Sequence, residues 1–113
     1  MDYFNIFAYG ELMKDEILFE LINRVPEKNL GKIYNFEKFF DEKIGYYGIK
    51  PKENSSVSGI ILFNINSTEL EIFDDYEDEG TYYSKNKTIC YDLNGKGYES
   101  YVYVRLEWKL WYW

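Results

Sequence analysis

The segment that most restricts the fold is residues 57–63, which read VSGIILF. Its closing run is β-branched and apolar at consecutive positions, so both faces of a strand formed there would be buried. Such a strand needs a neighbour on each side and apolar cover above and below. We therefore predict that it lies in the centre of a sheet and that the chain passes from it into a helix beginning near residue 67.

The predicted helix carries an acidic side chain on its apolar side. Leu70, Phe73 and Glu77 are spaced i, i+3 and i+7, which places them on one face of a helix. Thr68 and Glu71 have the spacing of a capping box near its start. Glu77 thus continues the stripe that the helix is expected to bury.

Glu77 is one of five acids between residues 73 and 79, in a chain with no histidine and a single cysteine. Proton-transfer chemistry would therefore draw on this cluster. A carboxylate among aromatic neighbours loses hydration, which raises its pKa and suits a general acid or base. The alternative is structural, because Glu77 could cap the helix end or accept a hydrogen bond as a satisfied buried acid. The residues alone leave both interpretations open.

A second candidate site lies near the N-terminus. Residues 4–9 favour a strand that stops at Gly10, and apolar residues then recur at helical spacing from Leu12 to Val25, just before Pro26. A strand that turns through glycine into a helix leaves main-chain N–H groups available to bind a carboxylate or an oxyanion. Many such turns bind nothing, so the pattern is weak by itself.

The remaining segments add strands and turns. Residues 29–41 predict an irregular strand or bend of open register, and residues 45–51 predict a compact aromatic turn, with 52–56 as its polar tip. Residues 82–91 and 98–104 flank Asn94 and Gly95, which is a hairpin signal. Together the elements predict one mixed α+β domain, residues 1–113, whose sheet is largely antiparallel toward the C-terminus.

Composition limits the partners. The net charge of −7 argues against nucleic acid or an anionic membrane surface, and no segment is apolar for long enough to span a membrane. Cys90 is the only cysteine, so no disulfide or cysteine-based zinc site can form within the chain. We expect a soluble, cytoplasmic protein. Its aromatic tail, residues 108–113, either lies over the domain or packs against a second subunit in a homodimer.

Five short motifs follow one another along nearly the whole chain: YGELM at 9–13, YYGIKP at 46–51, VSGI at 57–60, FDDYE at 73–77 and YSK at 83–85. In this order they resemble the gamma-glutamylcyclotransferase-like superfamily, especially its short gamma-glutamylamine cyclotransferase branch, also called AIG2-like. The resemblance implies a small mixed, largely antiparallel β-barrel with flanking helices, whose mouth takes a gamma-glutamyl group.

The resemblance also implies a reaction and its residues. A gamma-glutamyl amine or peptide would be cyclised to 5-oxoproline with release of the amine, without a metal or cofactor. Glu77 matches the acid/base glutamate of the family's LDxxE motif, and the substrate site would consist of Tyr9, Gly10, Glu11, Leu12, Tyr46 and Tyr83. Glu79 is a rival for the acid because Gly80 follows it, but it lacks an aspartate three residues earlier, so Glu77 is preferred.

Two departures from the family pattern bear on the substrate. Glu11 replaces the usual Ser or Thr and would repel a substrate carboxylate unless its side chain points outward. Lys85 stands where Arg is common, which keeps the charge but not the planar fork. Two alternatives therefore stay open: a non-catalytic small-molecule binding or interaction module of the same fold, and an enzyme of the same geometry for another acyl-amine.

Overall fold

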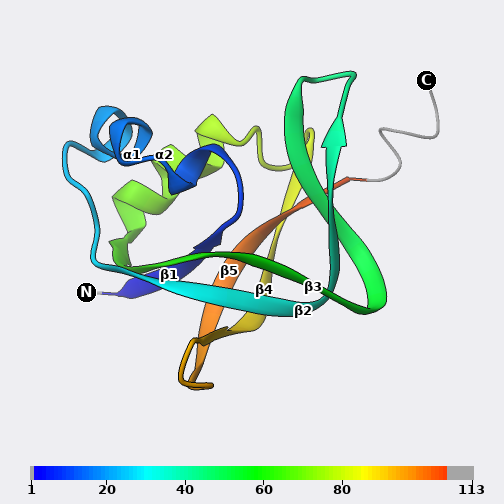
Figure 1. The fold of residues 1–113 in the computed structure, drawn as a ribbon. Coiled ribbons are helices and arrows are strands. Elements are labelled where there is room, and N and C mark those ends of the chain that lie inside the picture. The colour runs from blue at the N-terminus through cyan, green and yellow to red at the C-terminus, as the bar shows by residue number, and fades with distance from the viewer. Residues whose placement is uncertain (1, 107–113) are drawn as a thin grey trace.

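The computed structural model describes residues 2–106, which form a closed five-stranded barrel with helices against one side (Figure 1). In chain order the elements are β1 (Tyr3–Ala8), the 3-10 turn η1 (Glu11–Met13), α1 (Asp15–Ile22), β2 (Lys28–Asp41), β3 (Tyr46–Asn66), α2 (Ser67–Tyr76), β4 (Tyr83–Asp92) and β5 (Gly97–Arg105). The predicted α+β barrel with flanking helices is confirmed. None of the helices in the described part of the chain is long and apolar enough to cross a membrane.

The strands follow the order β1-β3-β2-β4-β5 around the barrel, and only the pairing of β1 with β5 is parallel. β3 therefore lies between β1 and β2, as the apolar run at 57–63 predicts. Ile61 shows why, because it pairs with Phe7 on one side and with Asn29 on the other and is fully buried. β3 is thus a long strand that pairs with a neighbour along each of its edges.

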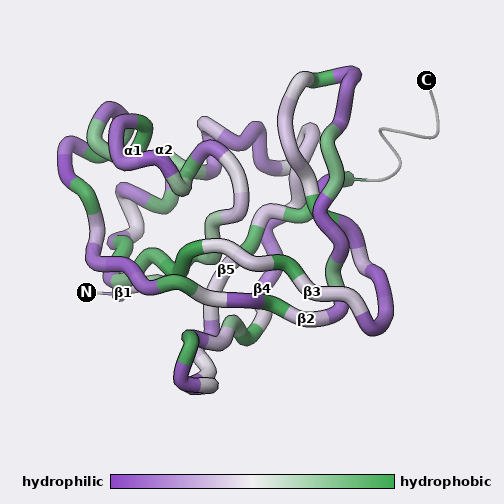
Figure 2. Tube along the Cα trace, in the orientation of Figure 1, coloured by the Kyte–Doolittle hydropathy of each residue, from purple (hydrophilic) through white to green (hydrophobic). Residues whose placement is uncertain are grey.

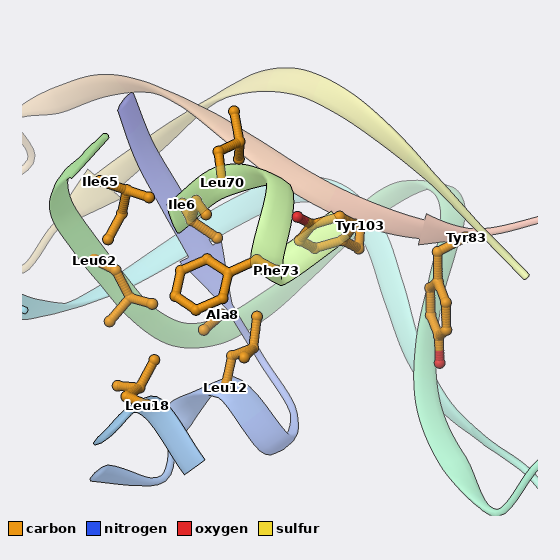
Figure 3. Close-up of a cluster of buried hydrophobic side chains, with 10 residues drawn as sticks. All are labelled: Ile6, Ala8, Leu12, Leu18, Leu62, Ile65, Leu70, Phe73, Tyr83 and Tyr103. Carbon is orange, nitrogen blue, oxygen red and sulfur yellow. The ribbon is translucent and has the colours of Figure 1, made fainter. Parts of the chain in front are cut away.

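Two apolar clusters share these strands. One fills the barrel and contains Phe7, Ile61 and Val102; the other lies between the barrel and the helices and contains Ile6, Leu62 and Phe73. Neighbouring residues such as Ile61 and Leu62 point to opposite clusters because side chains alternate along a strand. Figure 3 shows Phe73 of α2 reaching toward β1 in the second cluster. In Figure 2 the hydrophobic positions recur along the strands, whereas the connections are mostly hydrophilic.

The N-terminal helix is shorter than predicted and is broken. The single helix expected between Leu12 and Val25 is a 3-10 turn followed by α1, with Lys14 in an extended conformation between them. α1 ends at Asn23, whose φ of 59° is left-handed and whose N–H donates to the Phe19 carbonyl at 2.8 Å. The apolar spacing runs through the break because both pieces face the same core, where Leu12 and Leu18 are buried.

The prediction of an aromatic turn at residues 45–51 is wrong, because residues 46–51 form the first part of β3. It pairs with the end of β2, from Phe36 with Pro51 to Asp41 with Tyr46, and the reversal occurs at residues 42–45. Gly45 supplies the positive φ of 73°. Residues 52–56, predicted as a polar tip, lie within β3 where the register shifts opposite Asn35. Pro51 has no N–H to donate to the neighbouring strand, and a bulge is a place in a sheet where proline is accommodated.

α2 begins at residue 67 as predicted, but another pair caps it. The Asn66 side chain accepts from the Glu69 N–H at 2.8 Å, and the Glu69 carboxylate accepts from the Asn66 N–H at 3.1 Å. The predicted pair of Thr68 and Glu71 therefore does not form the capping box. The Glu69 carboxylate also accepts two hydrogen bonds of 2.7 Å from Arg24. These charge-assisted bonds hold the Glu69 side chain in the position from which it caps the helix.

Candidate active site

A pocket of about 340 Å³ lies where the ends of several elements meet. It is lined by the end of β1 with η1, the start of β3, the end of α2 and the start of β4. All seven residues singled out from the sequence line it: Tyr9, Gly10, Glu11, Leu12, Tyr46, Glu77 and Tyr83. Its volume falls in the range of small-molecule sites. Segments far apart in the chain thus form one cavity.

Glu77 stands at the C-terminal end of α2. Its N–H donates to the Phe73 carbonyl at 2.9 Å, so the main chain closes the helix while the side chain lines the pocket. The carboxylate is partly buried, and within residues 2–106 it accepts no hydrogen bond. Burial is the main reason that the pKa of Glu77 rises to about 7, and the charges of Asp78 and Glu11 add to it. An unpaired acid of this kind differs from the satisfied buried acid considered as the alternative.

The rival Glu79 lies elsewhere. Its side chain is exposed and does not line the pocket, and its N–H donates to the Asp74 carbonyl at 3.0 Å. Asp78 and Gly80 both have positive φ, so the chain turns sharply after α2 and carries Glu79 away from the cavity. The geometry favours Glu77 over Glu79 as the acid in the site.

The glycine turn forms another wall. η1 closes with hydrogen bonds from Met13 to Gly10 and from Lys14 to Glu11, each of 3.0 Å. The N–H groups of Glu11 and Leu12 precede these bonds and have no acceptor within the turn. Both residues line the same pocket as Glu77, so main-chain donors and a carboxyl group belong to one cavity.

Buried tyrosines give the pocket a rigid wall. The Tyr83 hydroxyl donates to the Tyr47 carbonyl at 2.8 Å, and the Tyr9 hydroxyl donates to the Tyr103 carbonyl. Burial raises the pKa of both Tyr9 and Tyr83 well above the usual value, and the charge of Glu77 contributes in each case. Both hydroxyls therefore stay protonated and committed to the main chain near neutral pH. Both side chains therefore line the cavity as fixed rings.

Asp74, one helical turn before Glu77, anchors α2 to the barrel. It accepts a hydrogen bond of 2.7 Å from the Tyr103 hydroxyl and one of 2.8 Å from the Lys85 ammonium. These contacts tie the helix to β5 and β4, respectively. Lys85, which departs from the family's Arg, is therefore occupied by Asp74 and does not line the pocket.

Sequence reasoning missed a buried ion pair behind the site. Arg105 Nε donates to Asp41 Oδ2 at 2.8 Å, and the two side chains are only 1% and 3% exposed. Arg105 also donates to the Tyr82 carbonyl at 2.8 Å and lies 5.3 Å from the centre of the Tyr82 ring. No local pattern marks this pair, because its members are 64 residues apart in the chain. It fixes the end of β2 and the start of β4 beside the pocket.

Eight residues of the lining were not singled out as site residues: Phe7, Ala8, Ile44, Tyr47, Tyr76, Asp78, Tyr82 and Tyr103. Most of them adjoin a residue that was singled out, and that adjacency was their only local signal. Among residues 2–106 no three His, Cys, Asp or Glu side chains lie close enough to hold a metal ion. Cys90 is buried in β4 beside Ser100, as expected of a strand residue. The aromatic tail at 108–113 lies outside the described residues.

Known proteins have sequences similar to this chain. The family profile described as "Gamma-glutamyl cyclotransferase, AIG2-like" matches residues 6–110. A Methanocaldococcus jannaschii protein named a gamma-glutamylcyclotransferase and putative RNase is 56% identical over 102 residues, which are 90% of this chain and 46% of that protein. AIG2-like protein D of Arabidopsis thaliana is 35% identical over 74 residues, or 66% of this chain and 49% of its own. The chain thus spans about half the length of both relatives.

A solved structure has the same fold as this chain. The solution structure of an Arabidopsis thaliana protein superimposes with a TM-score of 0.84 at 24% identity, covering 94% of this chain and 70% of that one. At this identity the likeness concerns the fold alone.

Proposed function

The chain belongs to the gamma-glutamyl cyclotransferase, AIG2-like family, and on that premise we propose that it cyclises a gamma-glutamyl amine or peptide to 5-oxoproline and releases the amine. The observation that carries the proposal is the unpaired Glu77 carboxyl, whose pKa is raised to about 7, in a pocket shared with the glycine turn. This arrangement places an unpaired carboxyl group and the glycine turn, with its main-chain donors, at a single cavity.

The reaction needs no nucleophile from the protein. Glu77 takes a proton from the substrate's α-ammonium, and the freed amine attacks the γ-carbonyl carbon to form the new C–N bond of the ring. The C–N bond to the leaving group then breaks as Glu77 returns that proton to the departing nitrogen, and the second proton that the ring nitrogen gives up passes to the released amine, which leaves as an ammonium. A carboxyl group whose pKa lies near neutral pH can do both, since neither transfer is steeply uphill.

The pocket contributes by holding the substrate folded on itself. Intramolecular attack in a well-oriented pair lowers the barrier by about 7–11 kcal/mol. The N–H groups of Glu11 and Leu12 are the candidates for binding the α-carboxylate or the oxyanion that develops on the γ-carbonyl. The walls of Tyr9 and Tyr83 restrict the space in which the substrate can extend.

The test is Glu77→Gln, which keeps the size of the side chain and removes the proton acceptor. We expect release of 5-oxoproline from a panel of gamma-glutamyl amines and dipeptides to fall by at least about 100-fold, the lower bound for such a group. Glu79→Gln is the matched control, because it changes an exposed acid two residues away. Full activity in Glu77→Gln would refute the assignment.

The second candidate function is a binding module without turnover. The observation that favours it is Glu11, a carboxylate in the turn that should receive the substrate's α-carboxylate. Wild-type protein that binds one member of the panel saturably, and releases 5-oxoproline from none, would support the module over the enzyme.

A further inference from the structure

The last turn of α2 is attached to the barrel by one polar side chain. Phe73 buries the middle of the helix, but no residue from 74 to 82 is buried, and among them only Asp74 and Glu77 are even partly so. Over the same segment, Asp74 is the only residue whose own side chain makes a hydrogen bond within the described part of the chain. The place of the helix end that carries Glu77 therefore depends on Asp74.

Both carboxylate oxygens of Asp74 have partners on the barrel. Oδ1 accepts from the Tyr103 hydroxyl of β5 at 2.7 Å, and Oδ2 accepts from the Lys85 ammonium of β4 at 2.8 Å. The Asp74 and Lys85 side chains are each 21% exposed, so water screens this pair less than a surface pair. The Lys85 ammonium also lies 5.1 Å from the centre of the Tyr101 ring, which helps to hold it beside Asp74.

These contacts connect Asp74 with the pocket. Tyr103 lines the cavity, and its carbonyl accepts from the Tyr9 hydroxyl of β1. Burial, followed by the hydrogen bond to Asp74, raises the pKa of the Tyr103 hydroxyl, so the hydroxyl stays protonated and remains a donor to Asp74. On the helix side, the Asp74 carbonyl accepts from the Glu79 N–H at 3.0 Å. Asp74 is thus bonded both to the pocket wall and to the turn around Glu77.

Glu77 itself has no comparable anchor. Its carboxyl accepts no hydrogen bond within residues 2–106, so its place in the pocket follows from where the helix end lies. Deepening the proposed function, in which Glu77 is the acid and base, we propose that Asp74 is a positioning residue. Paired with Lys85 and Tyr103, it holds the last turn of α2 against β4 and β5 and so keeps the Glu77 carboxyl inside the pocket.

The position of Glu77 and its protonation are linked, because burial is the main cause of its raised pKa. If the helix end were released from the barrel, the carboxyl would reach water, and the pKa of Glu77 would fall from about 7 toward 4.5. The other titratable groups that face the pocket are Glu11 of η1, Asp78 of the turn after α2, Tyr9 of β1, Tyr46 of β3, Tyr83 of β4 and Tyr103 of β5. The main test leaves all of these unchanged.

The test measures the pKa of Glu77 by NMR, from the carboxyl carbon signal that is lost in Glu77→Gln. The double variant Asp74→Asn with Lys85→Met removes one charge of each sign, so it leaves neither partner unpaired. We expect the pKa of Glu77 to fall from about 7 toward 4.5 in this variant. Release of 5-oxoproline near pH 8 should fall by roughly 10- to 100-fold, as a loss of kcat with KM little changed.

Two single variants separate positioning from stability. Arg24→Met removes the ion pair with Glu69 at the other end of α2, roughly 12 Å along the helix from Glu77. It should lower the thermal midpoint and leave the pKa of Glu77 at about 7. Lys85→Arg keeps a cation on Asp74 and should retain both the pKa of Glu77 and the activity of the wild type.

Tyr103→Phe is the milder perturbation in case the double variant does not fold. It deletes only the hydroxyl that donates to Asp74 and changes no charge, and it should shift the pKa of Glu77 in the same direction. A pKa of Glu77 that stays at about 7 in both variants would overturn the inference, because Asp74 would then only stabilise the fold.

The remaining outcomes separate this inference from the function on which it rests. A pKa of Glu77 that falls equally in Arg24→Met would overturn the role of Asp74, since any weakening of α2 would then have the same effect. The NMR measurement needs no substrate, so it decides the positioning of Glu77 whether or not the protein turns over. A wild-type protein that releases no 5-oxoproline from any gamma-glutamyl amide would refute the proposed function alone.

Discussion

Glu77→Gln should make the protein more stable above pH 7 even as it removes activity. The pKa of Glu77 rises from 4.5 to about 7 on folding, chiefly through burial, so the folded protein binds this proton more tightly than the unfolded chain does. Ionisation of a group with a raised folded pKa costs stability. The cost is absent below 4.5, where the carboxyl is protonated in both states, and it is complete above about 7.

The magnitude follows from the size of the shift. The difference between 4.5 and about 7 corresponds to about 3 kcal/mol of unfolding free energy. Part of it comes from Asp78 and Glu11, whose charges salt screens, so about 2 kcal/mol is expected at physiological ionic strength. Glutamine has nearly the same shape and no charge, and the variant should regain this amount only where the wild type is ionised.

Urea unfolding of both proteins between about pH 5 and pH 8 measures the difference. Contacts elsewhere, such as the pair of Asp41 with Arg105, are common to both proteins and cancel. Glu79→Gln supplies the baseline for removing an exposed acid two residues away. A stability gain that is the same at every pH, or a Glu77→Gln protein less stable than the wild type at pH 8, would refute the reasoning.

Three further predictions concern the site and its support. The kcat/KM for 5-oxoproline release should rise with pH through about 7, because Glu77 must be ionised to accept the proton, and a flat profile of kcat/KM against pH over this range would contradict that role. Arg105→Met leaves the Asp41 charge buried and should lower the unfolding free energy by about 3–5 kcal/mol, most of which the added change Asp41→Leu should restore; additive losses in urea unfolding would contradict this. Gly59→Ala places a methyl group 2.3 Å from the Ala8 carbonyl oxygen and should cost about 1–3 kcal/mol, and a thermal midpoint unchanged from the wild type would show that β1 and β3 can separate there.

Several elements could be read from local pattern. The apolar run around Ile61 predicts a central strand, and the structure places it between two neighbours. The spacing of Leu70 and Phe73 predicts the buried face of α2, with Glu77 at its end. The hairpin around Gly95 follows from its turn residues. Each of these signals lies within about ten residues, where periodicity and turn preference act directly.

Other local signals misled because longer-range pairing overrode them. Two glycines and a proline indicate a turn at residues 45–51, yet hydrogen bonding with β2 draws the segment into a strand and moves the reversal to residues 42–45. The apolar spacing from Leu12 onward predicts one helix, but the chain breaks at Lys14 and keeps both pieces on the same core. A hydrophobic pattern reports which side is buried and not whether the backbone is continuous.

The sequence by itself determined that the strand around Ile61 and the Leu70–Phe73 face of α2 would be buried, and it marked Glu77 as an acid on that apolar face. Only the tertiary structure decided that this acid shares a cavity with the turn at Gly10 and the tyrosines of β3 and β4, and that Asp41 and Arg105 pair behind them. The physical reason is that these contacts form when the barrel closes. Their energy depends on which distant strands become neighbours, and no local run of residues records that choice.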